Sequence, residues 1–193
     1  MPTASIILLN GVGSSGKTSL ARALQSASKD AFLHVQMDAF VAMLPPRYLD
    51  DPDGFTFASS TDDGKDVVSI HSGAVTQRVM RGMRRAMVAL AAEGNNLIVD
   101  EVLLGDEKND YARLFEPFEL VTVGVYCSLK VLEERERQRS DRLVGLARWQ
   151  YDKVHTGMTY NVTVDTSEAT PEECAQAVMR ALSSRIDVSR DFR

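Results

Sequence analysis

The sequence has few cysteines, no long apolar run and no excess of positive charge, and each absence excludes a class of protein. No run of 18 apolar residues occurs, which argues against a membrane-spanning helix. Lysine and arginine number 22 against 27 aspartates and glutamates, and this net charge of −5 argues against nonspecific nucleic-acid binding. The first residues, Met1-Pro2-Thr3-Ala4, lack a basic region, so we expect no signal peptide.

The scarcity of cysteine and histidine limits metal and disulfide chemistry. The two cysteines are Cys127 and Cys174, and the three histidines are scattered at positions 34, 71 and 155. Neither residue type has the spacing of a metal site. We therefore expect reduced thiols that pack inside a cytoplasmic protein. A length of 193 residues with 44% hydrophobic residues predicts a single domain, residues 1–193.

What the sequence does contain is a glycine-rich stretch at residues 11–18, Gly-Val-Gly-Ser-Ser-Gly-Lys-Thr. It fits the phosphate-binding pattern G-x-x-x-x-G-K-[ST] at every fixed position. An apolar run at residues 5–10 predicts a buried strand before it, and residues 19–25 predict a helix after it. Strand, glycine loop and helix are the context that the motif requires, which disfavours the alternative of a chance match in a Gly/Ser turn.

The residue types of this stretch suit a nucleoside triphosphate. Its glycines allow successive N–H groups to turn inward as a nest for phosphate oxygens, at the positive end of the following helix. Lys17 can reach the β- and γ-phosphates, and the Thr18 hydroxyl can be a ligand of Mg²⁺. The residues predicted to bind ATP are Gly11, Gly13, Ser14, Ser15, Gly16, Lys17, Thr18 and Ser19.

Strands and helices alternate along the rest of the chain. Strands are predicted at residues 5–10, 31–37, 96–99, 120–126 and 161–165, and helical patterns separate them. This alternation predicts an α/β fold with three layers, in which helices cover both faces of a five-stranded parallel sheet. Ligands of such sheets bind at the carboxyl ends of the strands.

Residues 45–70 interrupt this alternation. Two short strands, at residues 54–57 and 67–70, flank a turn-rich segment at residues 61–65 and predict a hairpin. Long insertions in compact domains are often lids or substrate-binding loops, and a surface hairpin without a role is the alternative.

Two carboxylates lie at predicted strand ends. Asp100 matches the Walker B position and is predicted to support Mg²⁺, although a carboxylate there can also cap the next segment. Asp38 is placed to orient an acceptor hydroxyl and to accept its proton late in phosphoryl transfer. As an alternative, Asp38 is the N-cap of a helix that begins at Ala39. Glu101 could bind the acceptor, order water or shape the site.

Two clusters of arginine lie on predicted helices. If residues 133–142 are helical, Arg135, Arg139 and Arg142 share one face, where an anion would relieve their mutual repulsion. This indicates a lid, at residues 133–149, that closes arginines over the γ-phosphate, and a solvated helix is the alternative. Four arginines between residues 78 and 85 are predicted to form a solvated face of the helix at residues 72–93.

Taken with these sites, the chain resembles the chloramphenicol phosphotransferase family. The first half carries Ile7-Leu8-Leu9-Asn10-Gly11, Met37-Asp38-Ala39-Phe40 and Ile98-Val99-Asp100-Glu101. The second half carries the most specific matches, which are Arg139-Ser140-Asp141-Arg142, Gly145, Ala147, Gln150, Val154-His155, Tyr160-Asn161-Val162 and Val164-Asp165-Thr166-Ser167.

The resemblance implies a P-loop kinase-like fold that transfers the γ-phosphate of ATP to a hydroxyl of a small antibiotic. By motif match, Asp38 would be the base, Lys17 and Thr18 would hold triphosphate and Mg²⁺, and the three lid arginines Arg135, Arg139 and Arg142 would act on the phosphates. The hairpin would lie on the acceptor side. A kinase for another hydroxylated natural product or metabolite is one alternative, and a regulatory ATPase in which Glu101 orients water is another. The sequence leaves open whether the chain forms a homo-oligomer.

Overall fold

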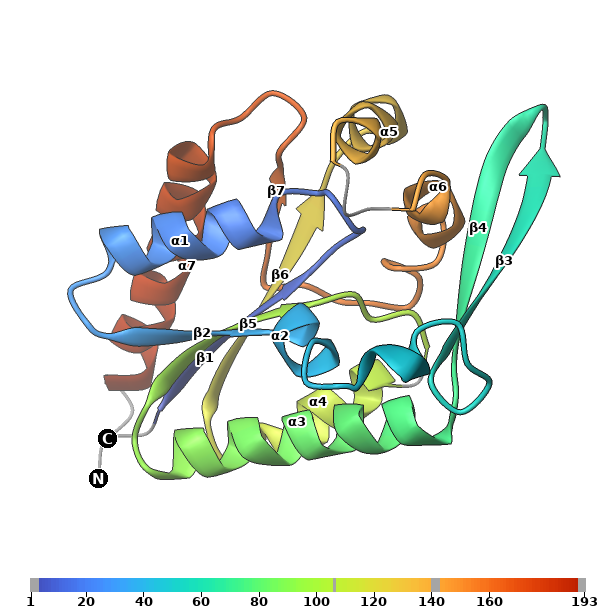
Figure 1. Cartoon of the computed structure of the whole chain (residues 1–193). Coiled ribbons are helices and arrows are strands. Elements are labelled where there is room, and N and C mark those ends of the chain that lie inside the picture. Colours follow the sequence, from blue (N-terminus) through green and yellow to red (C-terminus); the bar gives the residue numbers. More distant parts are fainter. Residues whose placement is uncertain (1–3, 106, 140–142, 191–193) are drawn as a thin grey trace.

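A five-stranded parallel sheet forms the middle layer of the protein (Figure 1). The computed structural model describes residues 4–105, 107–139 and 143–190. In spatial order the strands are β2 (Phe32–Gln36), β5 (Asn96–Glu101), β1 (Ser5–Asn10), β6 (Glu119–Tyr126) and β7 (Val162–Asp165). The predicted parallel sheet is therefore confirmed, with β1 at its centre.

Helices cover both faces of this sheet. Helices α1 (Lys17–Ala27) and α7 (Pro171–Arg190) lie on one face, and α3 (Ala74–Ala92) and α4 (Glu107–Leu114) lie on the other (Figure 1). Shorter elements lie near the carboxyl ends of the strands (Figure 1): α2 (Met37–Val41), the 3₁₀ helix η1 (Pro46–Tyr48), α5 (Leu129–Arg137) and α6 (Leu146–Tyr151). The three-layer α/β architecture is confirmed.

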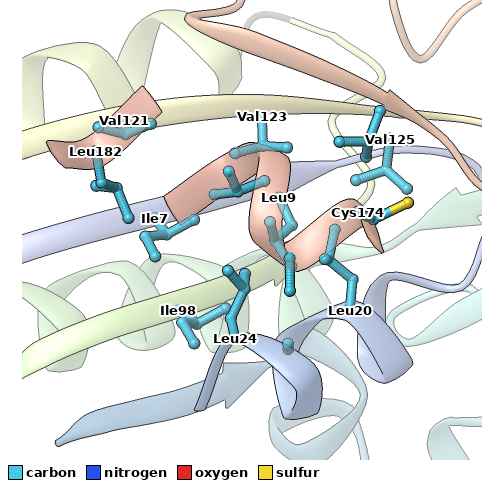
Figure 2. Packing of buried hydrophobic residues seen from close by; sticks show 14 residues of the cluster. Ile7, Leu9, Leu20, Leu24, Ile98, Val121, Val123, Val125, Cys174 and Leu182 are labelled. Carbon is cyan, nitrogen blue, oxygen red and sulfur yellow. The ribbon is translucent and has the colours of Figure 1, made fainter. Parts of the chain in front are cut away.

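Alternating side chains of the central strand form two hydrophobic cores. Ile7 and Leu9 of β1 point to the face covered by α1 and α7, where they pack with Leu20 and Leu24 (Figure 2). Ile6 and Leu8 point to the opposite face, where α3 and α4 cover them. A strand buried on both faces has no polar alternation, which is why the four residues 6–9 are all apolar.

The predicted hairpin is present and longer than expected. Strands β3 (Phe55–Asp62) and β4 (Lys65–Ser72) pair antiparallel as a two-stranded sheet apart from the main one. Their connection is Asp63-Gly64, in which both residues have positive φ, as in the turn that matches the twist of paired strands. The hairpin rises beside α6 (Figure 1).

Local hydrogen bonds fix the start of the last helix. At the start of α7, Glu173 N–H donates to Thr170 Oγ1 at 3.2 Å and Thr170 N–H donates to Glu173 Oε2 at 2.8 Å, which is a capping box.

Cys127 and Cys174 are both buried free thiols. Among the residues described, no helix combines the length and the apolar character needed to cross a membrane.

The packing on α1 gives a stability prediction. Leu20 is fully buried between α1 and the sheet, so Leu20→Ala should leave a cavity and lower the free energy of unfolding by about 2–5 kcal/mol. Leu33 of β2 is 40% exposed, so Leu33→Ala should cost much less. Urea unfolding of the two variants measures this difference, and equal losses would contradict the assigned core.

Candidate active site

The glycine-rich stretch forms a tight loop between β1 and α1. Ser14 (φ 64°) and Gly16 (φ 87°) both adopt the left-handed conformation, so the chain curls back before α1 begins at Lys17. The Ser15 N–H donates to Val12 O at 3.1 Å and closes the turn. Because the first N–H groups of a helix lack intrahelical partners, the loop and the start of α1 present donors at one point.

Gly11 has a structural role beneath this loop. A Cβ built on Gly11 would lie 2.5 Å from Val125 O on β6, too close for any side chain. Of the predicted loop residues, Gly13 through Ser19 line a cleft, whereas Gly11 is buried under it. Gly11 thus allows the loop to lie directly on the sheet.

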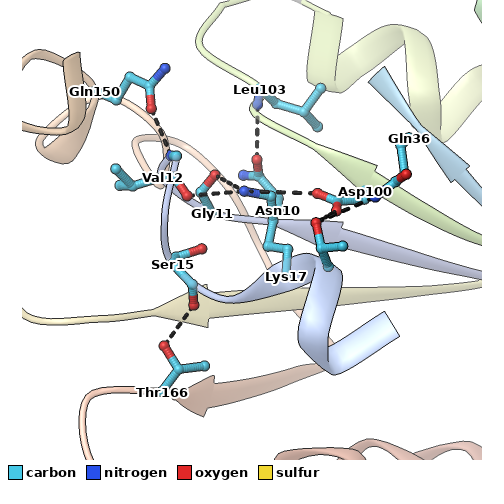
Figure 3. A network of polar contacts seen from close by, with 12 residues as sticks. Asn10, Gly11, Val12, Ser15, Lys17, Gln36, Asp100, Leu103, Gln150 and Thr166 are labelled. Atoms are coloured by element: carbon cyan, nitrogen blue, oxygen red, sulfur yellow. Dashed lines mark hydrogen bonds and ion pairs between the residues drawn. The ribbon is translucent and has the colours of Figure 1, made fainter. Parts of the chain in front are cut away.

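Lys17 and Asp100 lie close together at the carboxyl ends of the strands (Figure 3). Thr18 is hydrogen-bonded to Asp100 at the same place. The buried Lys17 Nζ donates to Gly11 O and Val12 O, both at 2.9 Å, and lies 3.8 Å from Asp100 Oδ1. Thr18 Oγ1 donates to Asp100 Oδ2 at 2.8 Å. The structure therefore brings together the side chains predicted to hold phosphate and metal.

The surroundings of Asp100 keep its carboxylate ionised. Burial would raise the pKa of Asp100, but the nearby His34 ring, the Lys17 charge and the Thr18 hydroxyl together lower that pKa below its usual value. His34 Nε2 on β2 lies 3.6 Å from Asp100 Oδ2. An ionised carboxylate and a neighbouring hydroxyl are oxygen ligands of the kind that Mg²⁺ prefers.

A cleft of about 1400 Å³ runs from the glycine-rich loop to the hairpin. At the loop end it is lined by residues 13–19 and by Asp100, Arg135, Arg139 and Gln150. Towards the hairpin it is lined by Asp38, Phe55, Phe57, Ile70, Arg81 and Arg84. We name these the donor half and the acceptor half.

Asp38 lies in the acceptor half, on the first turn of α2. That helix begins at Met37 with Gln36 as its N-cap, so the alternative of Asp38 as an N-cap is wrong. The helix starts one residue before Asp38 because β2 runs directly into it without a loop. Asp38 is exposed, and its position on the cleft wall is fixed by the packing of Met37 and Phe40 into the core.

The three lid arginines, Arg135, Arg139 and Arg142, were predicted to share one helix face, and the structure shows only part of this arrangement. Helix α5 ends at Arg137, so Arg139 lies beyond the helix, although it lines the cleft. In the last turn of this helix, the buried Glu136 carboxylate accepts hydrogen bonds from the N–H groups of Gly145 and Ala147 at the start of α6, so the chain turns into a second helix. Arg142 lies outside the described residues.

Arg135 contacts the segment after β7. Its guanidinium donates to Thr166 O at 2.7 Å and to Thr166 Oγ1 at 3.3 Å, and Thr166 Oγ1 donates to Ser15 O at 2.7 Å. A Cβ at Gly16 would lie 3.8 Å from Arg135 Nη1. Arg135 is therefore held at the edge of the glycine-rich loop.

The arginines of α3 correct another prediction. Gln77, Met80, Arg81 and Arg84 follow helical spacing and all line the acceptor half, so the arginine face is not simply a solvated one. The packing of α2 against α3 turns this face towards Asp38, an arrangement that helix periodicity alone does not reveal. Arg78 and Arg85 are exposed as predicted.

Comparison with known proteins shows the family of this chain. Residues 4–183 match the family model described as chloramphenicol phosphotransferase-like protein. The chain belongs to the chloramphenicol phosphotransferase-like family. The chain is also 34% identical, over 182 residues, to "Putative O-phosphotransferase Rv2636" of Mycobacterium tuberculosis. The alignment covers 91% of this chain and 81% of that protein.

Solved structures show the same fold at low identity. A sugar kinase from Janibacter sp. HTCC2649 has a TM-score of 0.66 at 17% identity, over 93% of this chain and 95% of that one. The Mycobacterium tuberculosis APS kinase CysC, in complex with AMPPNP and APS, has a TM-score of 0.64 at 14% identity, over 95% and 99%. The chain therefore combines the P-loop kinase fold with membership of a phosphotransferase-like family.

Glu101 is a site residue whose surroundings the sequence did not reveal. It is 4% exposed and accepts a hydrogen bond from the Tyr111 hydroxyl on α4. Burial raises the pKa of Glu101 to about 7, although the Tyr111 hydrogen bond and the Arg84 charge oppose that shift. Tyr111 comes from a helix ten residues away, so no sequence motif joined the two.

Asn10 and Gln150 are further residues whose roles the sequence analysis missed. The fully buried Asn10 donates from Nδ2 to Val154 O at 2.9 Å and accepts the Leu103 N–H on Oδ1 at 2.9 Å. Gln150 Oε1 accepts the Gly13 N–H at 2.8 Å. Asn10 and Gln150 belong to the segments that carry the family resemblance, which was the one available signal.

The free energy of unfolding of this protein should depend on pH, because folding changes the pKa of Glu101. The folded carboxyl binds its proton more tightly than the unfolded one, so its contribution to stability is present below pH 4.5 and is lost as pH rises through about 7. Relative to Glu101→Gln, the wild-type free energy of unfolding should fall by about 3 kcal/mol from pH 4 to pH 8. Urea unfolding without nucleotide or metal measures this, and a pH-independent difference would contradict it.

Proposed function

We propose that the protein is a Mg²⁺-dependent kinase that transfers the γ-phosphate of ATP to a hydroxyl of a small, chloramphenicol-like acceptor. The observation that carries the proposal is that one cleft contains both the glycine-rich loop and Asp38. A loop alone would support only nucleotide binding. A carboxylate facing the same space, beyond the loop, supports a second substrate.

The donor half suits a triphosphate with its metal. The left-handed turns at Ser14 and Gly16 and the start of α1 gather N–H donors where phosphate oxygens would bind. Thr18 Oγ1 and Asp100 Oδ2, which lie 2.8 Å apart, would hold Mg²⁺, which neutralises phosphate charge when bound. Lys17 would exchange its bonds to Gly11 O and Val12 O for phosphate oxygens.

Asp38 would act on the acceptor. An alcohol is too weak an acid to ionise at neutral pH, so the carboxylate first orients the hydroxyl by accepting its hydrogen bond. As the bond from the γ-phosphorus to its leaving oxygen breaks and the bond to the acceptor oxygen forms, the hydroxyl proton passes to Asp38. Arg135 and Arg139, which line the donor half, would stabilise the charge on the transferred group.

The acceptor half favours a ring with electronegative substituents. Phe55 and Phe57 stack with centroids 6.4 Å apart and provide an apolar surface with Ile70. Arg81 and Arg84 face the same space and would pair with electron-rich groups of the acceptor. This combination of surfaces supports an antibiotic such as chloramphenicol, and it also fits another hydroxylated natural product.

Removing the proposed base should stop transfer and spare nucleotide binding. Asp38→Asn keeps the size of the side chain but cannot take a proton, so kcat should fall by at least about 100-fold. The affinity for Mg·ATP, measured by calorimetry, should change little. Asp30→Asn, an exposed position outside the cleft, is the matched control. Full transfer by Asp38→Asn would show that another group is the base.

Incubation with ATP and hydroxylated antibiotics, chloramphenicol first, should yield a product that has gained one phosphoryl group by mass spectrometry. ATP should be consumed slowly without an acceptor and quickly with one. If no chloramphenicol product forms, chloramphenicol is excluded as the acceptor, but phosphoryl transfer to another hydroxylated compound is not. Full-rate ATP hydrolysis without acceptor, abolished by Glu101→Gln, would instead indicate a regulatory ATPase.

A further inference from the structure

Helix α6 is bonded to both walls of the cleft. At one end, Gly145 O accepts a hydrogen bond from Val68 N–H on the hairpin strand β4 at 3.1 Å. At the other end, Gln150 points towards the glycine-rich loop (Figure 3), and its Oε1 accepts a hydrogen bond from Gly13 N–H at 2.8 Å. The helix therefore connects the donor half directly with the strand that carries part of the acceptor wall.

At both contacts the backbone of a glycine lies close to its neighbour. A Cβ on Gly13 would lie 3.2 Å from Gln150 Oε1, and a Cβ on Gly145 would lie 2.7 Å from Asp66 O on β4. Gly145 also has a φ of +100°, which a residue with a side chain rarely adopts. A side chain at Gly145 would therefore push α6 away from the β4 backbone, whereas a side chain at Gly13 would displace only the end of the Gln150 side chain.

The helix is held as a unit between these contacts. Gly145 N–H and Ala147 N–H donate to the buried Glu136 carboxylate at 2.7 Å and 2.9 Å. Just beyond the helix, Val154 O accepts the Asn10 Nδ2 hydrogen bond at 2.9 Å. A helix fixed in this way transmits a restriction at Gln150 to Gly145 instead of absorbing it.

Gln150 contacts the glycine-rich loop directly, through its hydrogen bond with Gly13. Its side chain is only 6% exposed, and the Gly13 N–H fixes which amide atom is the acceptor. Bound phosphate would reduce the motion of the loop N–H groups, and Gln150 is hydrogen-bonded to one of them. The strand β4 pairs Ile70 with Phe57, so a restriction at Val68 reaches the residues of the acceptor wall.

We propose that Gln150 is a positioning residue through which nucleotide binding in the glycine-rich loop orders the acceptor-side hairpin. The proposal rests on the proposed nucleotide site. Restricting the loop restricts α6 through Gln150, and α6 restricts β4 through the bond between Gly145 and Val68. By reciprocity, a nucleotide that orders the hairpin raises acceptor affinity by the same factor by which the acceptor raises nucleotide affinity.

Hydrogen exchange with saturating Mg·AMPPNP tests this without knowledge of the acceptor. Trp149, the single tryptophan of the chain, lies in α6 on the cleft and reports saturation by fluorescence. In the wild type, amides of the loop and of β4 should both be protected, with exchange at Val68 slowed by at least about fivefold. The test variant is Gln150→Met, which keeps the bulk of the side chain but loses the acceptor oxygen.

In Gln150→Met, nucleotide should still protect the loop but should no longer slow exchange in β4. Gln138→Ala, which also removes a glutamine that lines the cleft, should behave as wild type. Val68→Pro breaks the other end of the connection at an edge strand and should likewise abolish protection of the hairpin, independently of how Gln150→Met folds.

Protection of β4 that persists in Gln150→Met, or that is absent in the wild type while the loop is protected, would overturn the proposal and leave the nucleotide site intact. Absence of protection in the wild-type loop itself would overturn the proposed nucleotide site, and this proposal with it. The two failures are therefore distinguishable in one experiment.

Discussion

The site depends on the parallel pairing of β1 with β5. This register places Asp100 beside Leu9, so that its carboxylate reaches Thr18 and Lys17 at the start of α1. The pairing is enforced from both faces, because β1 is buried between two hydrophobic cores and a shift by one residue would exchange them. Packing of apolar side chains thus determines the position of the ion pair between the buried Lys17 and the partly buried Asp100.

The elements with local signals were predictable from sequence. The motif at residues 11–18 requires a strand and a helix on either side, and both are present. The hairpin was predictable because Asp63-Gly64 suits a two-residue turn. Asp100 was correctly placed next to Thr18 because parallel strands end at the same edge of a sheet.

Contacts between distant segments were not predictable. The Glu136 carboxylate of α5 accepts hydrogen bonds from N–H groups at the start of α6, and helical spacing alone did not show that α5 ends at Arg137, before Arg139. The arginines at 81 and 84 face the cleft only because α2 packs against α3. Glu101 and Tyr111 meet only once β5 and α4 are packed together, and burial then changes the carboxyl group's pKa.

The central claim is direct transfer between two substrates that share one cleft. The measurement that tests it most directly uses ATP made chiral at the γ-phosphorus by oxygen isotopes, with whichever hydroxylated acceptor is phosphorylated. In-line transfer from the glycine-rich loop to a hydroxyl beside Asp38 predicts inversion of configuration at phosphorus. Retention would contradict the account, because it requires a second displacement through a phosphorylated enzyme.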